Sequence, residues 1–185
     1  MKNKQNNVRR TAIAIAFGLI APLTAARAAT DYGLLVKEAQ AGNAQAVQQL
    51  MLAARAGHSA EQYYAGLLYH YGWGVPQNNA KASAWWRKAA VQGNVSAEYN
   101  LGLAYYYGWG VPQDYAKADA WYEKAAVQGN VRAEANLGQA YYFGQGVPQD
   151  SVGAITWLRK AAAQGYAPAR HNLKIIETGS AGRSP

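Results

Sequence analysis

The segment GLAYYYGWGVPQDYAKADAWYEKAAVQG, residues 102–129, decides the fold because the chain repeats it. The related segment GLLYHYGWGVPQNNAKASAWWRKAAVQG occupies residues 66–93, and GQAYYFGQGVPQDSVGAITWLRKAAAQG occupies residues 138–165. Successive copies are 36 residues apart. A fixed period of this length is the signature of one supersecondary unit that stacks on copies of itself.

Each copy contains two helical patterns separated by a turn. In the second copy, apolar residues recur at helical spacing over about residues 95–107 and again over about 115–128, which predicts helix A and helix B of a helical hairpin. The glycines of the intervening GWGVPQD segment permit positive φ, and its proline prevents one continuous helix. Asp114 stands where an N-cap is expected, and Gly129 is placed to end helix B.

Small and large residues alternate in these patterns, which predicts an interdigitated stack. A glycine inside helix A recurs at the same register in every copy, and we expect it to mark a close approach of helices: Gly66, Gly102 and Gly138. The large rings that we expect to fill the space beside these contacts are Trp85, Trp121 and Trp157.

The second copy resembles the Sel-one-like repeat (SLR), a relative of the tetratricopeptide repeat. The matching positions are Ala97, Leu101, Gly102, Tyr105, Gly108, Gly110, Val111, Asp114, Lys117, Ala118, Trp121, Tyr122, Lys124, Ala125, Ala126 and Gly129. The resemblance implies an all-α fold, a right-handed α/α solenoid of about three and a half 36-residue helix-turn-helix repeats with capping helices.

The repeat boundaries divide the chain into seven segments. Open stacks require terminal units with an altered pattern, so we expect capping segments at both ends. The segments are a signal peptide (1–28), N-terminal capping helices (29–56), repeat 1 (57–92), repeat 2 (93–128), repeat 3 (129–164), a C-terminal half repeat (165–177) and a disordered tail (178–185).

The first 28 residues have the pattern of an export signal. A basic start precedes an apolar stretch, residues 11–24, that is too short to span a membrane, and Ala26-Arg27-Ala28 offers a cleavage site after Ala28. The pattern predicts a periplasmic or secreted protein, by either the general secretory or the twin-arginine route. Five of the 18 Lys and Arg residues lie in this segment, so cleavage leaves 13 against 10 acidic residues. The charge of the mature chain therefore gives no support to nucleic-acid binding.

No catalytic signature is present in the sequence. The chain has no cysteine, and no serine lies in a nucleophile motif. The three histidines, His58, His70 and His171, occupy different repeat positions, so the period does not bring them together. We therefore predict no enzyme, no cofactor and no metal site. Some SLR proteins have been linked to β-lactam binding or hydrolysis, but those members are cysteine-rich, so this activity is a lesser alternative.

The outward face of helix A is the candidate binding surface, because aromatic and amide residues recur there beside the core positions. In SLR proteins helix A commonly lines the concave surface, so the resemblance implies a groove for a partner. The alternative is that this face packs against the next repeat. The candidate residues are Tyr63, Leu67, His70, Tyr99, Asn100, Leu103, Tyr106, Asn136, Gln139 and Tyr142.

These observations predict a non-enzymatic scaffold of the bacterial periplasm or cell exterior that binds a protein or peptide partner through the concave helix-A face. We expect a monomer that binds no nucleic acid and whose mature chain does not insert into a membrane. An alternative is a cell-wall or carbohydrate-binding module that stacks exposed Tyr and Trp rings on sugars. The sequence does not identify the partner or the process.

Overall fold

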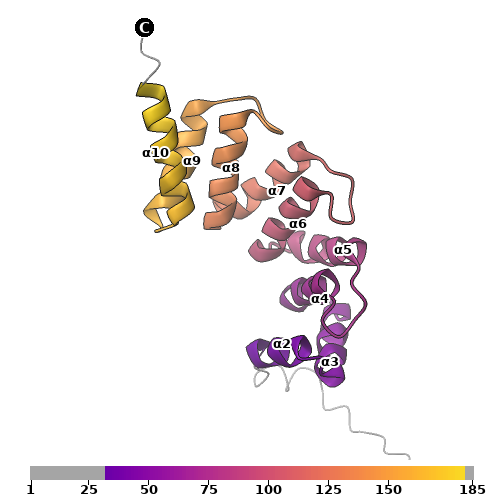
Figure 1. Ribbon diagram of the computed structural model, residues 1–185. Coiled ribbons are helices and arrows are strands. Elements are labelled where there is room, and N and C mark those ends of the chain that lie inside the picture. Colours follow the sequence, from indigo (N-terminus) through magenta and orange to yellow (C-terminus); the bar gives the residue numbers. More distant parts are fainter. Residues whose placement is uncertain (1–31, 182–185) are drawn as a thin grey trace, which may run out of the picture. The chain divides into compact units, whose positions relative to one another are not determined.

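The computed structural model describes residues 32–181, and over this range the chain forms helices and no strands. The helices are α2 (Tyr32–Gln40), α3 (Ala44–Arg55), α4 (Ser59–Tyr71), α5 (Asn79–Ala90), α6 (Val95–Tyr107), α7 (Tyr115–Val127), α8 (Val131–Phe143), α9 (Ser151–Ala163) and α10 (Ala167–Ala181). Each helix packs against the next one in the chain (Figure 1). The predicted solenoid of stacked α-helical hairpins is confirmed.

The helices fall where the period places them. In repeat 2, α6 has the predicted bounds of helix A, and α7 ends one residue before the predicted end of helix B. The helices α2 and α3 lie within the segment 29–56 that was predicted to cap the stack. The predicted signal peptide, residues 1–28, lies outside the described residues.

The C-terminal helix is longer than the sequence indicated. We expected residues 178–185 to form a disordered tail, but α10 continues through Ala181, and residues 182–185 lie outside the described range. Thr178 supports the extension because its Oγ1 donates to the carbonyl oxygen of Lys174 at 2.7 Å. Two residues earlier, the side chain of Ile176 is buried against α9 and so ties this end of the helix to the core.

The turn between helix A and helix B closes on itself through hydrogen bonds that recur in each copy. In repeat 2, Gly108 ends α6 in the left-handed region at φ +73°. Gln113 Nε2 donates to the carbonyl oxygen of Tyr106 at 2.7 Å, which satisfies a free acceptor at the helix end. Asp114 then begins α7 because its Oδ1 accepts from the backbone N–H of Lys117 at 3.0 Å. The predicted capping role of Asp114 is confirmed.

The glycine inside helix A permits the close contact that its repetition predicted. A Cβ atom on Gly102 would lie 2.5 Å from the ring of Tyr122 in α7, and a Cβ atom on Gly138 would lie 2.5 Å from Cγ of Leu158 in α9. A Cβ atom on Gly66 would overlap the indole ring of Trp86 in α5. Because these distances leave no room for a side chain, glycine is required for helices A and B to pack this closely.

The residue that fills this space is not the predicted one. We expected Trp85, Trp121 and Trp157, but the buried side chains against the glycines are those of the following residues: Trp86, Tyr122 and Leu158. The predicted tryptophans are only partly buried. Each lies beneath a lysine one helical turn later in a cation–π contact, as with Lys124 Nζ at 4.2 Å from the Trp121 ring centroid.

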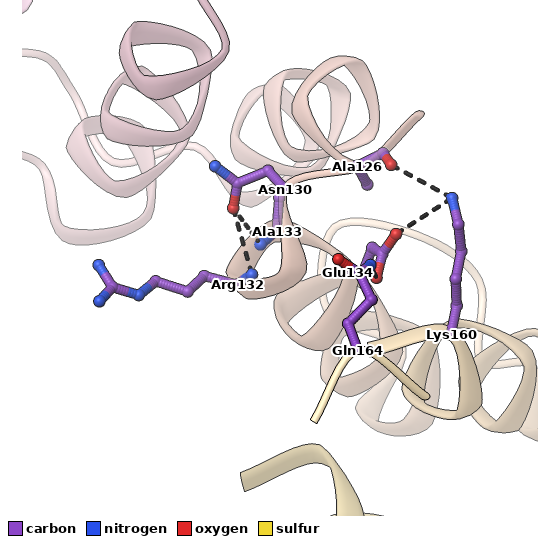
Figure 2. A network of polar contacts seen from close by, with 7 residues as sticks. All are labelled: Ala126, Asn130, Arg132, Ala133, Glu134, Lys160 and Gln164. Carbon is purple, nitrogen blue, oxygen red and sulfur yellow. Dashed lines mark hydrogen bonds and ion pairs between the residues drawn. The ribbon is translucent and has the colours of Figure 1, made fainter. Parts of the chain in front are cut away.

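A buried polar bridge connects the two helices of each repeat. In repeat 3, Gln164 Nε2 donates to Glu134 Oε2 at 2.7 Å, and Lys160 Nζ forms an ion pair with Glu134 Oε1 at 3.1 Å (Figure 2). Gln128 and Glu98 form the same hydrogen bond in repeat 2. The bridge therefore recurs with the period and fixes the end of helix B against helix A.

Candidate binding pocket on the helix A face

A pocket of about 320 Å³ opens where repeats 2 and 3 meet. Its walls are largely aromatic: Tyr99, Tyr106, Tyr107, Tyr122 and Phe143. Its other polar side chains are those of Asp119, Asn136, Gln139 and Gln145. Leu103 and Ala140 complete the lining. A volume near 300 Å³ is at the lower end of the range for small-ligand sites in proteins.

The two A helices form the sides of this pocket, and a B helix forms its base. The helices α6 and α8 supply most of the lining, α7 supplies Asp119 and Tyr122, and the turn after α8 supplies Gln145. The helix-A face is therefore hollowed between these two repeats, and buried side chains of helix B lie at the bottom of the hollow.

Two polar groups at the base are buried without hydrogen-bond partners. Asp119 is 5% exposed and Tyr122 is 1% exposed, and neither Asp119 Oδ2 nor Tyr122 Oη has a partner of normal geometry. Burial raises the pKa of Asp119 to about 7 and raises the pKa of Tyr122 above its usual range. Buried polar groups in folded proteins are nearly always satisfied, so this pair is an exception that needs an explanation.

Two departures from the repeat create the pocket. At the position of Gln145, repeat 2 has Trp109, whose ring lies 4.7 Å from the ring of His70 in the preceding repeat. At the position of Asp119, repeat 1 has Ser83, whose hydroxyl donates to the carbonyl oxygen of Trp109. Between repeats 1 and 2 an indole thus covers the site and a serine satisfies the backbone. Between repeats 2 and 3 the indole is missing and an acid is present.

The rim of the pocket carries exposed aromatic rings. Tyr107 is 56% exposed and Phe143 is 67% exposed, at equivalent positions of repeats 2 and 3. Tyr107 makes an edge contact with Tyr106, with ring centroids 4.8 Å apart. A large exposed ring beside a concave surface is typical of a contact that another molecule completes.

The pocket brings together five of the ten residues that the sequence singled out: Tyr99, Leu103, Tyr106, Asn136 and Gln139. Tyr106 and Gln145 close one side, with 3.5 Å between Tyr106 Oη and Gln145 Oε1. The aromatic members are half-buried, because they also pack against the core of their own repeats.

The other predicted residues lie in separate places. Tyr63 and Asn100 line a second hollow of about 310 Å³, which includes Arg132 at the start of α8. Tyr142 lines a third hollow, beside α10.

Leu67 and His70 contribute to packing between repeats 1 and 2. Leu67 packs against the core cluster that includes Trp86. His70 lies between aromatic rings, and its Nδ1 is 3.0 Å from Oδ1 of Asn79.

Sequence reasoning missed the base of the pocket. Asp119, Tyr122 and Gln145 were not among the candidates. The available signal was variation between copies, since Asp119 stands where the other copies have Ser83 and Ile155. Comparison of the copies gives most weight to positions that all three share. It therefore does not detect a site formed by residues that differ between them.

The described part of the chain shows neither a metal centre nor a membrane span. Over residues 32–181, no three His, Asp or Glu side chains are grouped so that they would hold a metal ion. In the same range, every helix is too short or too polar to cross a bilayer.

The fold and the pocket together define an α-helical repeat solenoid whose notable surface is a hollow between repeats. The model of the Sel1 repeat matches residues 62–94, 95–130 and 131–166, and the chain belongs to this family. Sel1 repeat proteins are generally scaffolds for protein–protein interaction. A comparison with functionally curated proteins finds no match.

Solved structures support this assignment. The chain is 35% identical to c5321, a protective antigen of uropathogenic Escherichia coli that displays an SLR fold, with a TM-score of 0.74 over 80% of this chain. It is 34% identical to a Sel1 repeat protein from Oxalobacter formigenes, with a TM-score of 0.72 over 80% of this chain. Cysteine rich protein B of Helicobacter pylori, at 23% identity and a TM-score of 0.55, shares the fold; the match covers 78% of this chain and 98% of that one.

The chain covers only part of its more similar relatives. It spans 33% of the Escherichia coli antigen and 59% of the Oxalobacter formigenes protein. The similarity therefore concerns the repeat array.

Proposed function

We propose that the protein is a non-enzymatic scaffold, exported to the periplasm or cell exterior, that binds a protein partner through the helix-A face of repeats 2 and 3. The observation that carries the proposal is the pocket between α6 and α8, with its buried polar base and exposed aromatic rim. In this proposal the chain acts as a monomer and contributes no chemistry of its own.

The architecture of the surface supports this role. Aromatic side chains supply large contact areas at low entropic cost, and they are enriched where proteins bind each other. Tyr107 and Phe143 present such rings to solvent beside a hollow into which a partner side chain would fit. Anchoring one side chain in a pocket surrounded by apolar contacts is the usual arrangement of an interaction hot spot.

Site-specific photocrosslinking tests the binding face. A photoreactive phenylalanine at Tyr107 places the probe on the rim, and the same residue at Val127 places it on an exposed site at the end of α7 that does not line the pocket. We expect a discrete adduct in cells from position 107 and none from position 127. Equal adducts from both positions, or none from either, would count against the proposed face.

Export is tested separately. The basic and apolar pattern of residues 1–28 supports cleavage after Ala28. We expect N-terminal sequencing of the periplasmic or secreted protein to begin at Ala29. A protein that retains Met1 in the cytoplasm would contradict the proposed export. It would not bear on the proposed binding face.

One observation favours a second candidate, a carbohydrate-binding module. An exposed ring recurs at the end of helix A in each repeat, as Tyr71, Tyr107 and Phe143, and the first two stack on the neighbouring Trp73 and Trp109. Exposed aromatic faces are suited to stacking on sugar rings. Retention of the protein on purified peptidoglycan, abolished by Tyr71→Ala with Tyr107→Ala, would favour this candidate over a protein partner.

A further inference from the structure

The base of the pocket between repeats 2 and 3 carries an acid without a counter-charge. Among the eleven residues that line the pocket in the described part of the chain, Asp119 is the only acid, and none is Lys, Arg or His. Its Oδ2 atom has no hydrogen-bond partner, and Tyr122 Oη has none of normal geometry, although the side chain of Asn136 lies beside it. A buried carboxylate without a partner is costly, and a bound cation with hydrogen-bond donors would remove much of that cost.

The walls above this acid are suited to a flat cation. Asn136, Gln139 and Gln145 line the pocket with side-chain amides, each of which contains an acceptor oxygen, and tyrosine side chains line it beside them. A guanidinium group is planar, carries five N–H donors, pairs with carboxylates and stacks on aromatic rings. An ammonium group has three donors and is more strongly hydrated, so it makes poorer use of these walls.

We infer that this pocket receives an arginine side chain of the protein partner, with the guanidinium group against Asp119 and the tyrosine rings around it. The inference rests on the proposed function and specifies the chemistry of the partner.

The repeat itself contains a comparison that supports the assignment. At the equivalent place between repeats 1 and 2, Trp109 and His70 are in contact, and Ser83 donates to the turn. At the junction of repeats 2 and 3, Asp119 therefore stands in place of Ser83, whose hydroxyl has a partner. Gln145 stands there in place of Trp109, whose indole fills the space. Both differences favour a site that accepts donors from outside the chain.

The direct test titrates the purified mature protein with N-acetyl-arginine methylamide and follows the side-chain amide signals of Asn136, Gln139 and Gln145 by NMR. The matched control is N-acetyl-citrulline methylamide, which has the same shape without the charge. We expect saturable arginine binding with a dissociation constant on the order of 1 mM, as for a small fragment, and citrulline binding at least about tenfold weaker. Equal binding of both compounds, or no shifts at roughly 20 mM arginine, would overturn the inference.

Variants taken from the repeat itself localise the binding. Asp119→Ser installs the residue of repeat 1, and Gln145→Trp installs the residue of repeat 2 that covers the equivalent place. Each is expected to weaken arginine binding by at least about tenfold, with the circular dichroism of the folded protein retained. Asp114→Asn is the charge-matched control, because it removes a partly exposed acid outside the pocket from the start of the same helix, and it is expected to leave the affinity unchanged. Unchanged affinity in Asp119→Ser would place the arginine elsewhere.

The source of the guanidinium is tested with a peptide. If the arginine belongs to a protein, N-acetyl-Gly-Arg-Gly-amide binds at least as tightly as free L-arginine. Tighter binding of the free amino acid would overturn the assignment to a protein partner.

Failure of the proposed function is distinguishable from failure of the arginine assignment. If the proposed function is wrong, arginine binds in vitro but the probe at Tyr107 yields no adduct. If instead the adduct at Tyr107 persists undiminished in Asp119→Ser, the scaffold function stands and the arginine assignment fails.

Discussion

Gln164 Nε2 donates a 2.7 Å hydrogen bond to Glu134 Oε2 and thereby joins the end of α9 to a fully buried carboxylate in α8. The equivalent pair in repeat 1 is Gln92 and Gln62, where Gln92 Nε2 donates to Gln62 Oε1, also at 2.7 Å. The repeat therefore tolerates either an acid or an amide at the accepting position, provided that an acceptor oxygen faces the glutamine of helix B. This tolerance means that the hydrogen bond, more than the charge, is the constant element.

We predict that Glu134→Leu lowers the free energy of unfolding by about 1–3 kcal/mol, because the amide of Gln164 loses its acceptor and Lys160 loses its ion pair. Glu134→Gln is the matched control and is expected to cost less, since Gln62 occupies this position in repeat 1. Urea denaturation followed by circular dichroism measures both. A leucine variant as stable as the glutamine variant would contradict the importance of the acceptor.

Gly102→Ala is predicted to destabilise the protein by about 1–3 kcal/mol, because the new Cβ atom would lie 2.5 Å from the buried ring of Tyr122. Helix propensity alone acts in the opposite direction, since alanine favours a helix by about 1 kcal/mol over glycine. The sign of the change, measured by urea denaturation, therefore shows which effect dominates.

Gly153→Ala provides the control for Gly102→Ala. This glycine is also helical, but the atom nearest to a Cβ placed on it would be Oδ2 of Asp150, at 2.7 Å, which belongs to an exposed side chain whose other oxygen, Oδ1, makes the N-cap hydrogen bond to Val152. We expect a gain of up to about 1 kcal/mol in thermal or urea denaturation. If both glycine variants are stabilised, the close contact between α6 and α7 does not limit packing.

The sequence predicted the fold well because the fold depends on positions that the copies share. The glycine of helix A, the capping Asp114 and the bounds of α6 all follow from the period. The orientation of helix B was harder to predict. Trp85 and Trp86 are adjacent and both apolar, and the pattern does not determine which of them faces Gly66. A rotation of about 100° per residue separates the two choices, and helix packing alone decides between them.

The pocket was only half predictable for a related reason. Its sides, such as Tyr106 and Asn136, lie on a helix face that a helical wheel identifies. Its base depends on what repeat 3 lacks, namely an indole at position 145, and on Asp119, which pattern matching treats as a substitution of no consequence. Whether a missing side chain leaves a cavity depends on how its neighbours fill the space, which only three-dimensional packing shows.

Asn130→Ala is predicted to lower the free energy of unfolding by about 1 kcal/mol, the usual cost of losing an N-cap. Asn130 Oδ1 accepts from the backbone N–H groups of Arg132 at 3.2 Å and Ala133 at 3.0 Å (Figure 2). Asn130→Ser retains an acceptor and is expected to preserve most of the stability. Chemical denaturation compares the two variants, and an Asn130→Ala variant as stable as the native protein would show that the cap contributes nothing.

Asp119 is predicted to make the stability of the protein depend on pH. Burial raises the pKa of this carboxyl to about 7 from an ordinary value of 3.8. Between about pH 4 and pH 7 the folded protein therefore retains a proton that the unfolded chain releases, so the free energy of unfolding falls as the pH rises through this range. Below about pH 4 both states are protonated and the penalty is absent, whereas above about pH 7 it is complete.

Asp119→Ser removes the titrating group and is expected to remove this part of the pH dependence. The surrounding wall introduces no competing titration in the range, because the tyrosines that face Asp119, Tyr106 and Tyr122, have pKa values raised above their usual value. We expect the advantage of the variant over the native protein to grow by up to about 4 kcal/mol between pH 4 and pH 8, in urea denaturation without ligand. Parallel stability curves for the two proteins over this range would mean that Asp119 titrates normally and that water reaches the base of the pocket.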